Sequence, residues 1–107
     1  MKKLLTIFVL FFYAFQINAE EINSSQAENI GGVIFKIGYE NPFSGKINTY
    51  RDEKLILAAD FEKGLLNGRY EEYFNDQSIK KSAYYLNGKL SGEYIEYYKS
   101  GSIRLQT

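Results

Sequence analysis

Two glutamates that recur in similar surroundings are the residues most able to do chemistry. Glu72 and Glu96 stand 24 residues apart, and Glu71 adjoins the first of them. Two carboxyl groups that converge in a cleft can serve as general acid and general base. The pattern around them instead predicts two strands that lie one repeat apart in a thin sheet, without a pocket. We therefore expect solvated strand positions with a cross-strand cation, Lys81 opposite Glu72, contributing about 0.2–1 kcal/mol.

Other reactive side chains are scarce in this chain. It has no cysteine and no histidine, so it lacks thiolates, disulfides and the commonest metal ligand and general base. The glycines at 64, 68, 88 and 92 precede predicted strands, whereas a phosphate-binding loop needs a helix N-terminus after it. We expect no catalytic, cofactor-binding or metal-binding residues, and we expect that the protein is not an enzyme.

The first 19 residues have the pattern of a secretory signal peptide. Lys2 and Lys3 precede an apolar run from Leu4 to Phe15 that contains one polar residue, Thr6, and Ala19 precedes two glutamates. We expect a signal helix over 1–19, with cleavage after Ala19 and export to the periplasm or the medium. The alternative is an uncleaved leader that anchors the protein in a membrane, although the run is short for a span.

Charge argues against two classes of partner. Removal of Lys2 and Lys3 leaves 11 basic and 13 acidic side chains, a net charge near −2, with no basic block. Nucleic acid is therefore not an expected partner, and contact with a membrane is expected only through an uncleaved leader.

The chain repeats itself with a period of 24 residues. Segments 61–80 and 85–104 align without a gap and share eight identical positions of 20. A fainter earlier copy, shifted by one residue, places Gly45, Tyr50 and Ile56 before Gly68, Tyr73 and Ile79. A period of 20–50 residues indicates stacked supersecondary units. The shared positions are Gly64/Gly88, Leu66/Leu90, Gly68/Gly92, Tyr70/Tyr94, Glu72/Glu96, Tyr73/Tyr97, Ser78/Ser102 and Ile79/Ile103.

The repeated unit is predicted to be a β-hairpin. Asn87-Gly88 between apolar flanks is the strongest short hairpin signal, and Lys63-Gly64 takes the same place one repeat earlier. Segments 75–78 and 99–102 have turn composition, and Tyr-, Ile- and Phe-rich strands lie between the turns. We expect an all-β domain over 33–107, an elongated single-layer antiparallel meander, with a first strand at 33–39. Segment 20–32 is expected to be a disordered lead-in.

Two sets of repeat residues are candidates for structural or binding roles. The glycines are expected to form turns or to leave room where another backbone or a ring comes close. The aromatic side chains alternate between the two faces of the sheet, and they either form the core or present a binding surface, since Tyr is enriched at interfaces. The glycines are Gly45, Gly64, Gly68, Gly88 and Gly92, and the aromatic residues are Tyr70, Tyr73, Phe74, Tyr94, Tyr97 and Tyr98.

The pattern over 39–107 resembles the MORN repeat. Gly64-x-x-x-Gly68-x-Tyr70-x-x-Tyr73-Phe74, a short turn, Ile-Lys and an aromatic-Asn-Gly hairpin are similar to its bacterial variant, found in proteins named YwqK-family antitoxins. The segment from Tyr39 to Ile47, with Pro42-Phe43-Ser44-Gly45, is similar to the start of that group. The resemblance implies an elongated sheet of hairpins that serves as an interaction surface.

Together these observations predict an exported, non-enzymatic repeat protein that acts as a protein–protein interaction module in the envelope or outside the cell. The alternative is an antitoxin or immunity protein that sequesters a toxin, although an export leader fits poorly with a cytoplasmic toxin. The partner is expected to be another protein, and a homodimer through the last edge strand is a further expectation, because a bare strand edge favours pairing.

Overall fold

The computed structural model describes residues 20–107; the predicted signal helix and its cleavage site after Ala19 lie outside the described residues. Nine strands and one 3₁₀ turn make up this part of the chain. None of its helical segments has the length and hydropathy that a membrane span requires. The elements are β1 (Glu21–Asn23), η1 (Ser24–Gln26), β2 (Ala27–Ile30), β3 (Val33–Lys36), β4 (Gly45–Arg51), β5 (Lys54–Glu62), β6 (Leu65–Tyr73), β7 (Ile79–Leu86), β8 (Lys89–Tyr97) and β9 (Ile103–Gln106).

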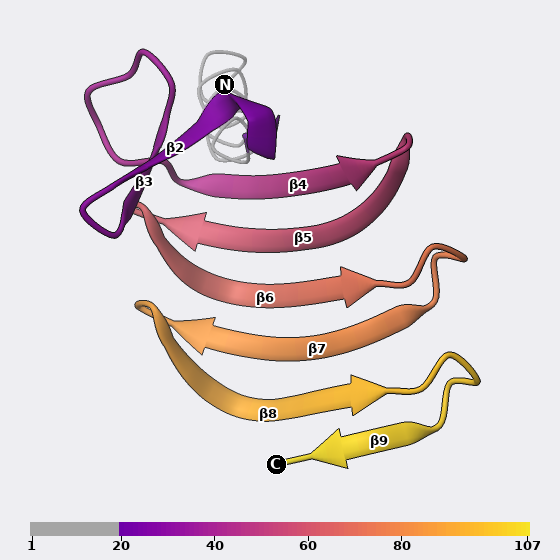
Figure 1. Cartoon of the computed structure of the whole chain (residues 1–107). Helices are drawn as coiled ribbons and strands as arrows, with labels where there is room; N and C mark the ends of the chain where they lie inside the picture. The colour runs from indigo at the N-terminus through magenta and orange to yellow at the C-terminus, as the bar shows by residue number, and fades with distance from the viewer. Residues whose placement is uncertain (1–19) are drawn as a thin grey trace, which may run out of the picture.

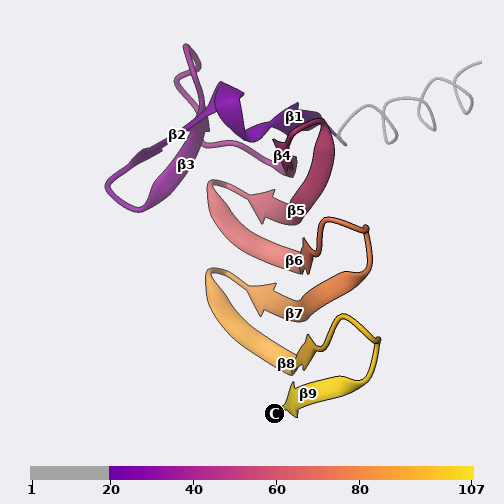
Figure 2. The same cartoon turned by 45° about the vertical axis from the view of Figure 1, so that its right-hand side comes forward.

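Seven of the strands form one sheet in the order β1-β4-β5-β6-β7-β8-β9. From β4 to β9 each strand pairs antiparallel with the next along the chain, as Figure 1 shows. The predicted antiparallel sheet of hairpin strands is confirmed. The exception is β1, which pairs parallel with β4 at the N-terminal end of the sheet (Figure 2).

The predicted turns lie where the sequence indicates them. Asn87 and Gly88 have φ of 50° and 82°, and Lys63 and Gly64 have 51° and 82°. Positive φ at both central residues is the requirement of a type I′ hairpin, which explains the Asn-Gly pair. The wider turns at the other side of the sheet also match each other: Phe74 N–H donates to the Ser78 carbonyl at 2.8 Å, and 24 residues later Tyr98 N–H donates to the Ser102 carbonyl at 2.9 Å.

Gly68 and Gly92 occupy equivalent bulges, and only Gly68 has a close neighbour. The strand register shifts between Ala59 and Phe61 opposite Gly68, and again between Ala83 and Tyr85 opposite Gly92. A Cβ atom on Gly92 would have no atom within 4 Å, so the expected close approach is wrong there. At Gly68 the neighbour is the side chain of Asp60, 2.9 Å from a Cβ, rather than a backbone or a ring. Each bulge bends its strand, and the backbone there has a positive φ, 121° at Gly68 and 85° at Gly92. Glycine is favoured at both positions because it adopts positive φ without steric strain.

The prediction that 20–32 is disordered is wrong, because this segment is paired and partly buried. Ile22 lies opposite Ile47 in the β1–β4 pair, and the side chain of Ile22 is 5 % exposed. The carbonyl of Glu20 accepts a hydrogen bond of 2.8 Å from Lys46 N–H. Burial of one apolar side chain and satisfied backbone groups hold a segment whose composition is otherwise polar.

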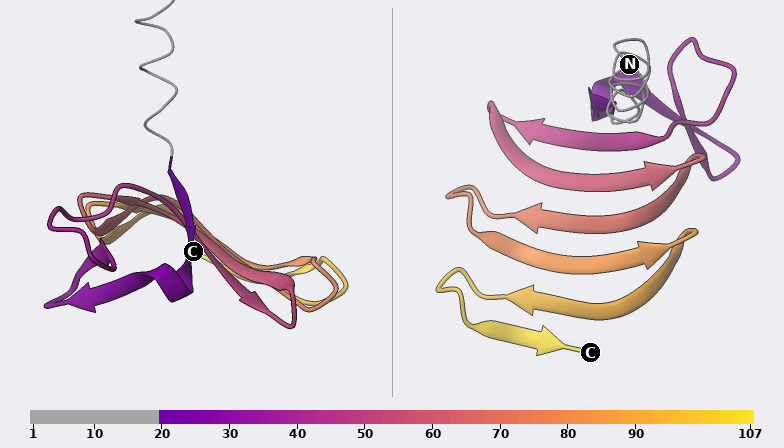
Figure 3. Two further views of the ribbon diagram at one scale, coloured as in Figure 1. Left: turned by 90° about the horizontal axis from the view of Figure 1, so that it is seen from above. Right: turned by 180° about the vertical axis from the view of Figure 1, so that it is seen from behind.

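The first predicted strand, 33–39, is also corrected. Only Val33–Lys36 is a strand, and it pairs with β2 in a separate two-stranded sheet. Seen from above, this hairpin lies to one side of the curved main sheet (Figure 3). It is attached by backbone bonds: Ile34 N–H donates to the Gly64 carbonyl and Phe43 N–H donates to the Ile34 carbonyl, both at 2.9 Å. The β domain therefore begins before residue 33.

The core lies at the N-terminal end of the sheet and not among the tyrosines. Ile22, Phe43 and Ile47 form the buried cluster, and Ala27, Ile34 and Phe61 pack against it as partly buried neighbours. Within residues 20–107 the other buried apolar side chains are Ala59 and Ala83, both small residues on the sheet. The N-terminal segments thus form a cap that supplies the covering layer, which the later hairpins lack.

Candidate functional site

Strand pairing places the repeated polar residues in rows across one face of the sheet. Ala59, Tyr70, Ala83 and Tyr94 are aligned from β5 to β8. A second row lies on the same face, two residues away from the first row on each strand. It consists of Leu57, Glu72, Lys81, Glu96 and Leu105. We call this side the ladder face; the next residues along the strands, including Tyr73 and Tyr97, point to the opposite face.

Hydrogen bonds and ion pairs connect the two rows of the ladder face. Tyr70 O–H donates to Glu72 at 2.7 Å, and Lys81 Nζ lies 3.4 Å from the same carboxylate. One repeat later Tyr94 O–H donates to Glu96, and Arg104 Nη1 donates to that carboxylate at 2.8 Å. Lys81 Nζ also lies 5.4 Å from the centroid of the Tyr94 ring. The predicted Glu72–Lys81 pairing is confirmed.

These contacts raise the pKa values of the ladder tyrosines. Partial burial, followed by the hydrogen bond to Glu72, raises the pKa of Tyr70 to about 12. The hydrogen bond to Glu96 raises the pKa of Tyr94. Partial burial lowers the pKa of Lys81, but the contacts with Tyr94 and Glu72 outweigh it and raise the pKa overall. The ladder is therefore held with its phenols protonated and its lysine charged.

In Tyr70→Phe, the free energy of unfolding is expected to fall less at high pH than it does in the wild-type protein. Because folding raises the pKa of Tyr70 from 10.0 to about 12, its contribution is fully present below pH 10 and is lost as the pH rises toward 12. Discounted for partial exposure, this contribution is on the order of 1 kcal/mol. Urea unfolding at about pH 9 and about pH 11 measures it. Tyr84→Phe, whose parent side chain is 52 % exposed, is the control; an equal drop in Tyr70→Phe and wild type would contradict the assignment.

The two repeated glutamates are not arranged as an acid and a base. Each accepts a hydrogen bond from its own tyrosine and faces its own cation, Lys81 or Arg104. Lys81 stands between them, since it is paired with Glu72 on one side and Glu96 on the other. Such an arrangement stabilises cross-strand packing and leaves neither carboxylate free for proton transfer.

The candidate aromatic residues are divided between the two faces. Tyr70 and Tyr94 lie on the ladder face, whereas Tyr73 lies on the other, where its hydroxyl donates to Glu71 at 3.2 Å. Phe74 and Tyr98 occupy equivalent places beside the wider turns. None of these side chains is fully buried, and Tyr98 is 53 % exposed. The hypothesis that they form the core is therefore wrong.

Ring contacts are fewer than the repeat suggests. The Tyr70 ring meets the edge of the Tyr85 ring with centroids 5.7 Å apart, a contact that sequence reasoning missed. Lys80 Nζ lies 5.9 Å from the centroid of the Phe74 ring, within the range of a cation–π contact. Arg104, at the equivalent position one repeat later, pairs with Glu96 instead.

A groove of about 560 Å³ separates the β2–β3 hairpin from the ladder face. It is lined mainly by apolar side chains, among them Ile34, Ile47, Leu57, Phe61 and Tyr70. Since part of this lining belongs to the core of the cap, the groove is the open margin of that core.

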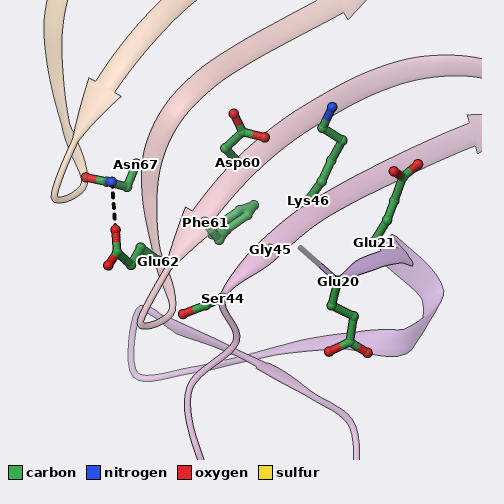
Figure 4. Close-up of a pocket in the computed structure, with 9 residues that line it drawn as sticks. All are labelled: Glu20, Glu21, Ser44, Gly45, Lys46, Asp60, Phe61, Glu62 and Asn67. Atoms are coloured by element: carbon green, nitrogen blue, oxygen red, sulfur yellow. Dashed lines mark hydrogen bonds between the residues drawn. The ribbon is translucent and has the colours of Figure 1, made fainter. Parts of the chain in front are cut away.

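A second hollow beside the cap collects acidic residues without bringing them together. Figure 4 shows the carboxylates of Glu20, Asp60 and Glu62 pointing in different directions, with Lys46 among them. Glu62 accepts a hydrogen bond of 3.1 Å from Asn67. Within residues 20–107, no group of three or more potential ligands is arranged to hold a metal ion.

Comparison of the chain with protein-family models, with curated proteins and with solved structures found no match.

Proposed function

We propose that this chain is an exported, non-enzymatic repeat protein of the MORN type that binds another protein through the exposed faces of its sheet. Its unit is a pair of strands of 24 residues, and the sheet grows by adding further units. The proposal joins the leader-like sequence of residues 1–19 to the repeated hairpins of residues 45–106.

Matching contacts in successive hairpins support the repeat. Bulges after Glu72 and after Glu96 interrupt the pairing at the same place in β6 and β8, and a bulge after Thr49 marks the fainter first copy in β4. The tip of each hairpin is also attached to the preceding unit in the same way. Gly64 N–H donates to the Phe43 carbonyl and Gly88 N–H donates to the Leu66 carbonyl, both at 2.8 Å.

The observation that carries the binding function is the uncovered tyrosine surface. Away from the cap, no second layer covers either face of the sheet in the described part of the chain, and Tyr84 and Tyr98 are each more than half exposed. Tyr is a preferred anchor residue because it offers a large rigid contact area and a hydroxyl. The aromatic rings that remain exposed to solvent are suited to contact with a protein partner.

The double variant Tyr73→Ala/Tyr97→Ala is expected to weaken partner capture by about thirtyfold or more, as two anchor tyrosines of roughly 1–2 kcal/mol each would. The measurement is crosslinking of the tagged protein in the cell envelope, followed by identification and titration of the captured protein. Tyr39→Ala removes a tyrosine that is 61 % exposed and lies outside the strands of the main sheet, and it is the control. Undiminished capture by Tyr73→Ala/Tyr97→Ala, at an unchanged melting temperature, would contradict the proposal.

A further inference from the structure

Two neighbouring hollows lie beside the wider turns and share part of their lining, which includes side chains of the ladder face together with Tyr73 and Tyr97. Their volumes are about 390 and 460 Å³, and both are lined by Glu72, Phe74, Lys80 and Lys99. The first continues to Arg51 and the second to Arg104. The combined hollow, here called the turn-side groove, therefore runs across the strands from β4 to β9.

The turn-side groove is basic in a part of the chain that is acidic overall. Five cations line it, and its two carboxylates, Glu72 and Glu96, are already paired with Lys81 and Arg104. The remaining cations have no carboxylate within 4.0 Å among the described residues. The groove thus carries a net charge near +3, while residues 20–107 carry a net charge near −2. Its cations are Arg51, Lys80, Lys81, Lys99 and Arg104.

The repeat sets the spacing of the groups in this groove. Phe74 and Tyr98, and likewise Lys80 and Arg104, occupy equivalent positions 24 residues apart. Equivalent residues stand two strands apart, which corresponds to about 9.5 Å. A polyproline II segment rises about 3.1 Å per residue with three residues per turn, so every third side chain recurs after about 9.3 Å on the same side. The two periods match.

We propose that the turn-side groove binds an acidic segment of a partner protein in an extended, polyproline II conformation, with a carboxylate at every third residue. This inference rests on the proposed binding function and names the chemistry of the partner. Residues three apart in the segment would lie on Phe74 and Tyr98, the repeat-equivalent rings that have the matching period. Its carboxylates would meet Lys80, Lys99 and Arg51, the cations of the groove that have no carboxylate partner among the described residues. Nucleic acid fits less well, because its phosphates are much more closely spaced and would also meet Glu72 and Glu96.

Fluorescence anisotropy with a labelled peptide of about 12 residues, built from Glu-Pro-Pro triplets, tests the groove. We expect the full chain to bind this peptide at low salt and Lys80→Glu/Lys99→Glu to bind it at least about tenfold more weakly. Lys63→Glu/Lys89→Glu makes the same change of charge beside the tighter turns, which lie at the other ends of the strands from the groove (Figure 1). This variant should bind within about twofold of wild type.

Three results would overturn the inference. Equal losses in the two double variants would show attraction by overall charge alone. Equal binding of a peptide that carries its glutamates in one block would show that the spacing of the carboxylates does not matter. Tighter binding of a single-stranded oligonucleotide of the same length would show that the groove prefers nucleic acid to an acidic protein segment. If the peptide does not bind and Lys80→Glu/Lys99→Glu still captures the envelope partner, this inference fails while the binding function stands. Tyr73 and Tyr97 also line the two hollows. If Tyr73→Ala/Tyr97→Ala binds the peptide as wild type does and captures its partner undiminished, the groove stands and the tyrosine surface fails.

Discussion

Gly64→Ala is expected to lower the free energy of unfolding by about 2–5 kcal/mol, the larger of two costs at equivalent hairpin tips. The φ of 82° at Gly64 costs any L residue about 1–2 kcal/mol. A Cβ at this position would also lie 2.3 Å from Val33 Cγ1 and 2.9 Å from the Ile34 carbonyl oxygen. Since one of these atoms belongs to the backbone, overpacking adds about 1–3 kcal/mol.

Gly88→Ala is the matched control for this prediction. Gly88 has the same φ of 82° in the same type of turn, but a Cβ there would lie no closer than 3.9 Å to Leu65. The expected cost is therefore the backbone term alone, about 1–2 kcal/mol. Urea unfolding of both variants gives the two free energies. Equal costs would mean that the β2–β3 hairpin does not pack on the tip at Gly64.

The regular hairpins of the sheet were predictable because their signals are local. Asn87-Gly88 specifies a type I′ turn by itself, and alternation along 69–74 divides side chains between the faces without any knowledge of the neighbouring strands. The Glu72–Lys81 contact followed as soon as the turn at 75–78 was fixed, since a turn of known length sets the register. These local signals therefore predict that Tyr70 and Glu72 share a face and that Lys81 lies opposite Glu72, whereas the pair formed by Arg104 and Glu96 appears only in the structure.

The cap was missed because its pairing is not local. β1 has three residues and gains its partners only from β4, more than 20 residues away. One signal was present: Gly31-Gly32 between Asn29-Ile30 and Val33-Ile34 is a recognised hairpin pair. The polar composition of 20–32 outweighed it. The bulges at Gly68 and Gly92 escaped for a similar reason, because a bulge depends on the partner strand.

The turn-side groove could not be predicted from spacing alone. The repeat places Lys80 and Arg104 at equivalent positions, yet only Arg104 has a carboxylate partner, Glu96. Lys80 instead lies over the ring of Phe74. Which cations stay unpaired is decided by side-chain contacts across the strands, and that difference distinguishes a binding groove from a row of neutralised charges.

Ile22→Ala is expected to cost about 2–5 kcal/mol of unfolding free energy, the range for truncating a large aliphatic side chain in a core. Ile22 is 5 % exposed and packs with Phe43 and Ile47, although it belongs to the segment that composition predicts to be disordered. A domain of this size has little other core, so the loss would remove a large part of its stability.

Ile30→Ala removes the same atoms from the same segment and should cost less than about 0.5 kcal/mol, because Ile30 is 56 % exposed. Chemical denaturation of residues 20–107 carrying each change gives the comparison. Two small and equal costs would return 20–32 to the status of a disordered lead-in and leave β4 as the edge of the sheet. A large cost at Ile22 alone would mean that the residues directly after the predicted cleavage site are part of the fold. Ile22 would then be the point where β1 covers the N-terminal edge of the sheet, so that within residues 20–107 β9 is the edge strand at the other end.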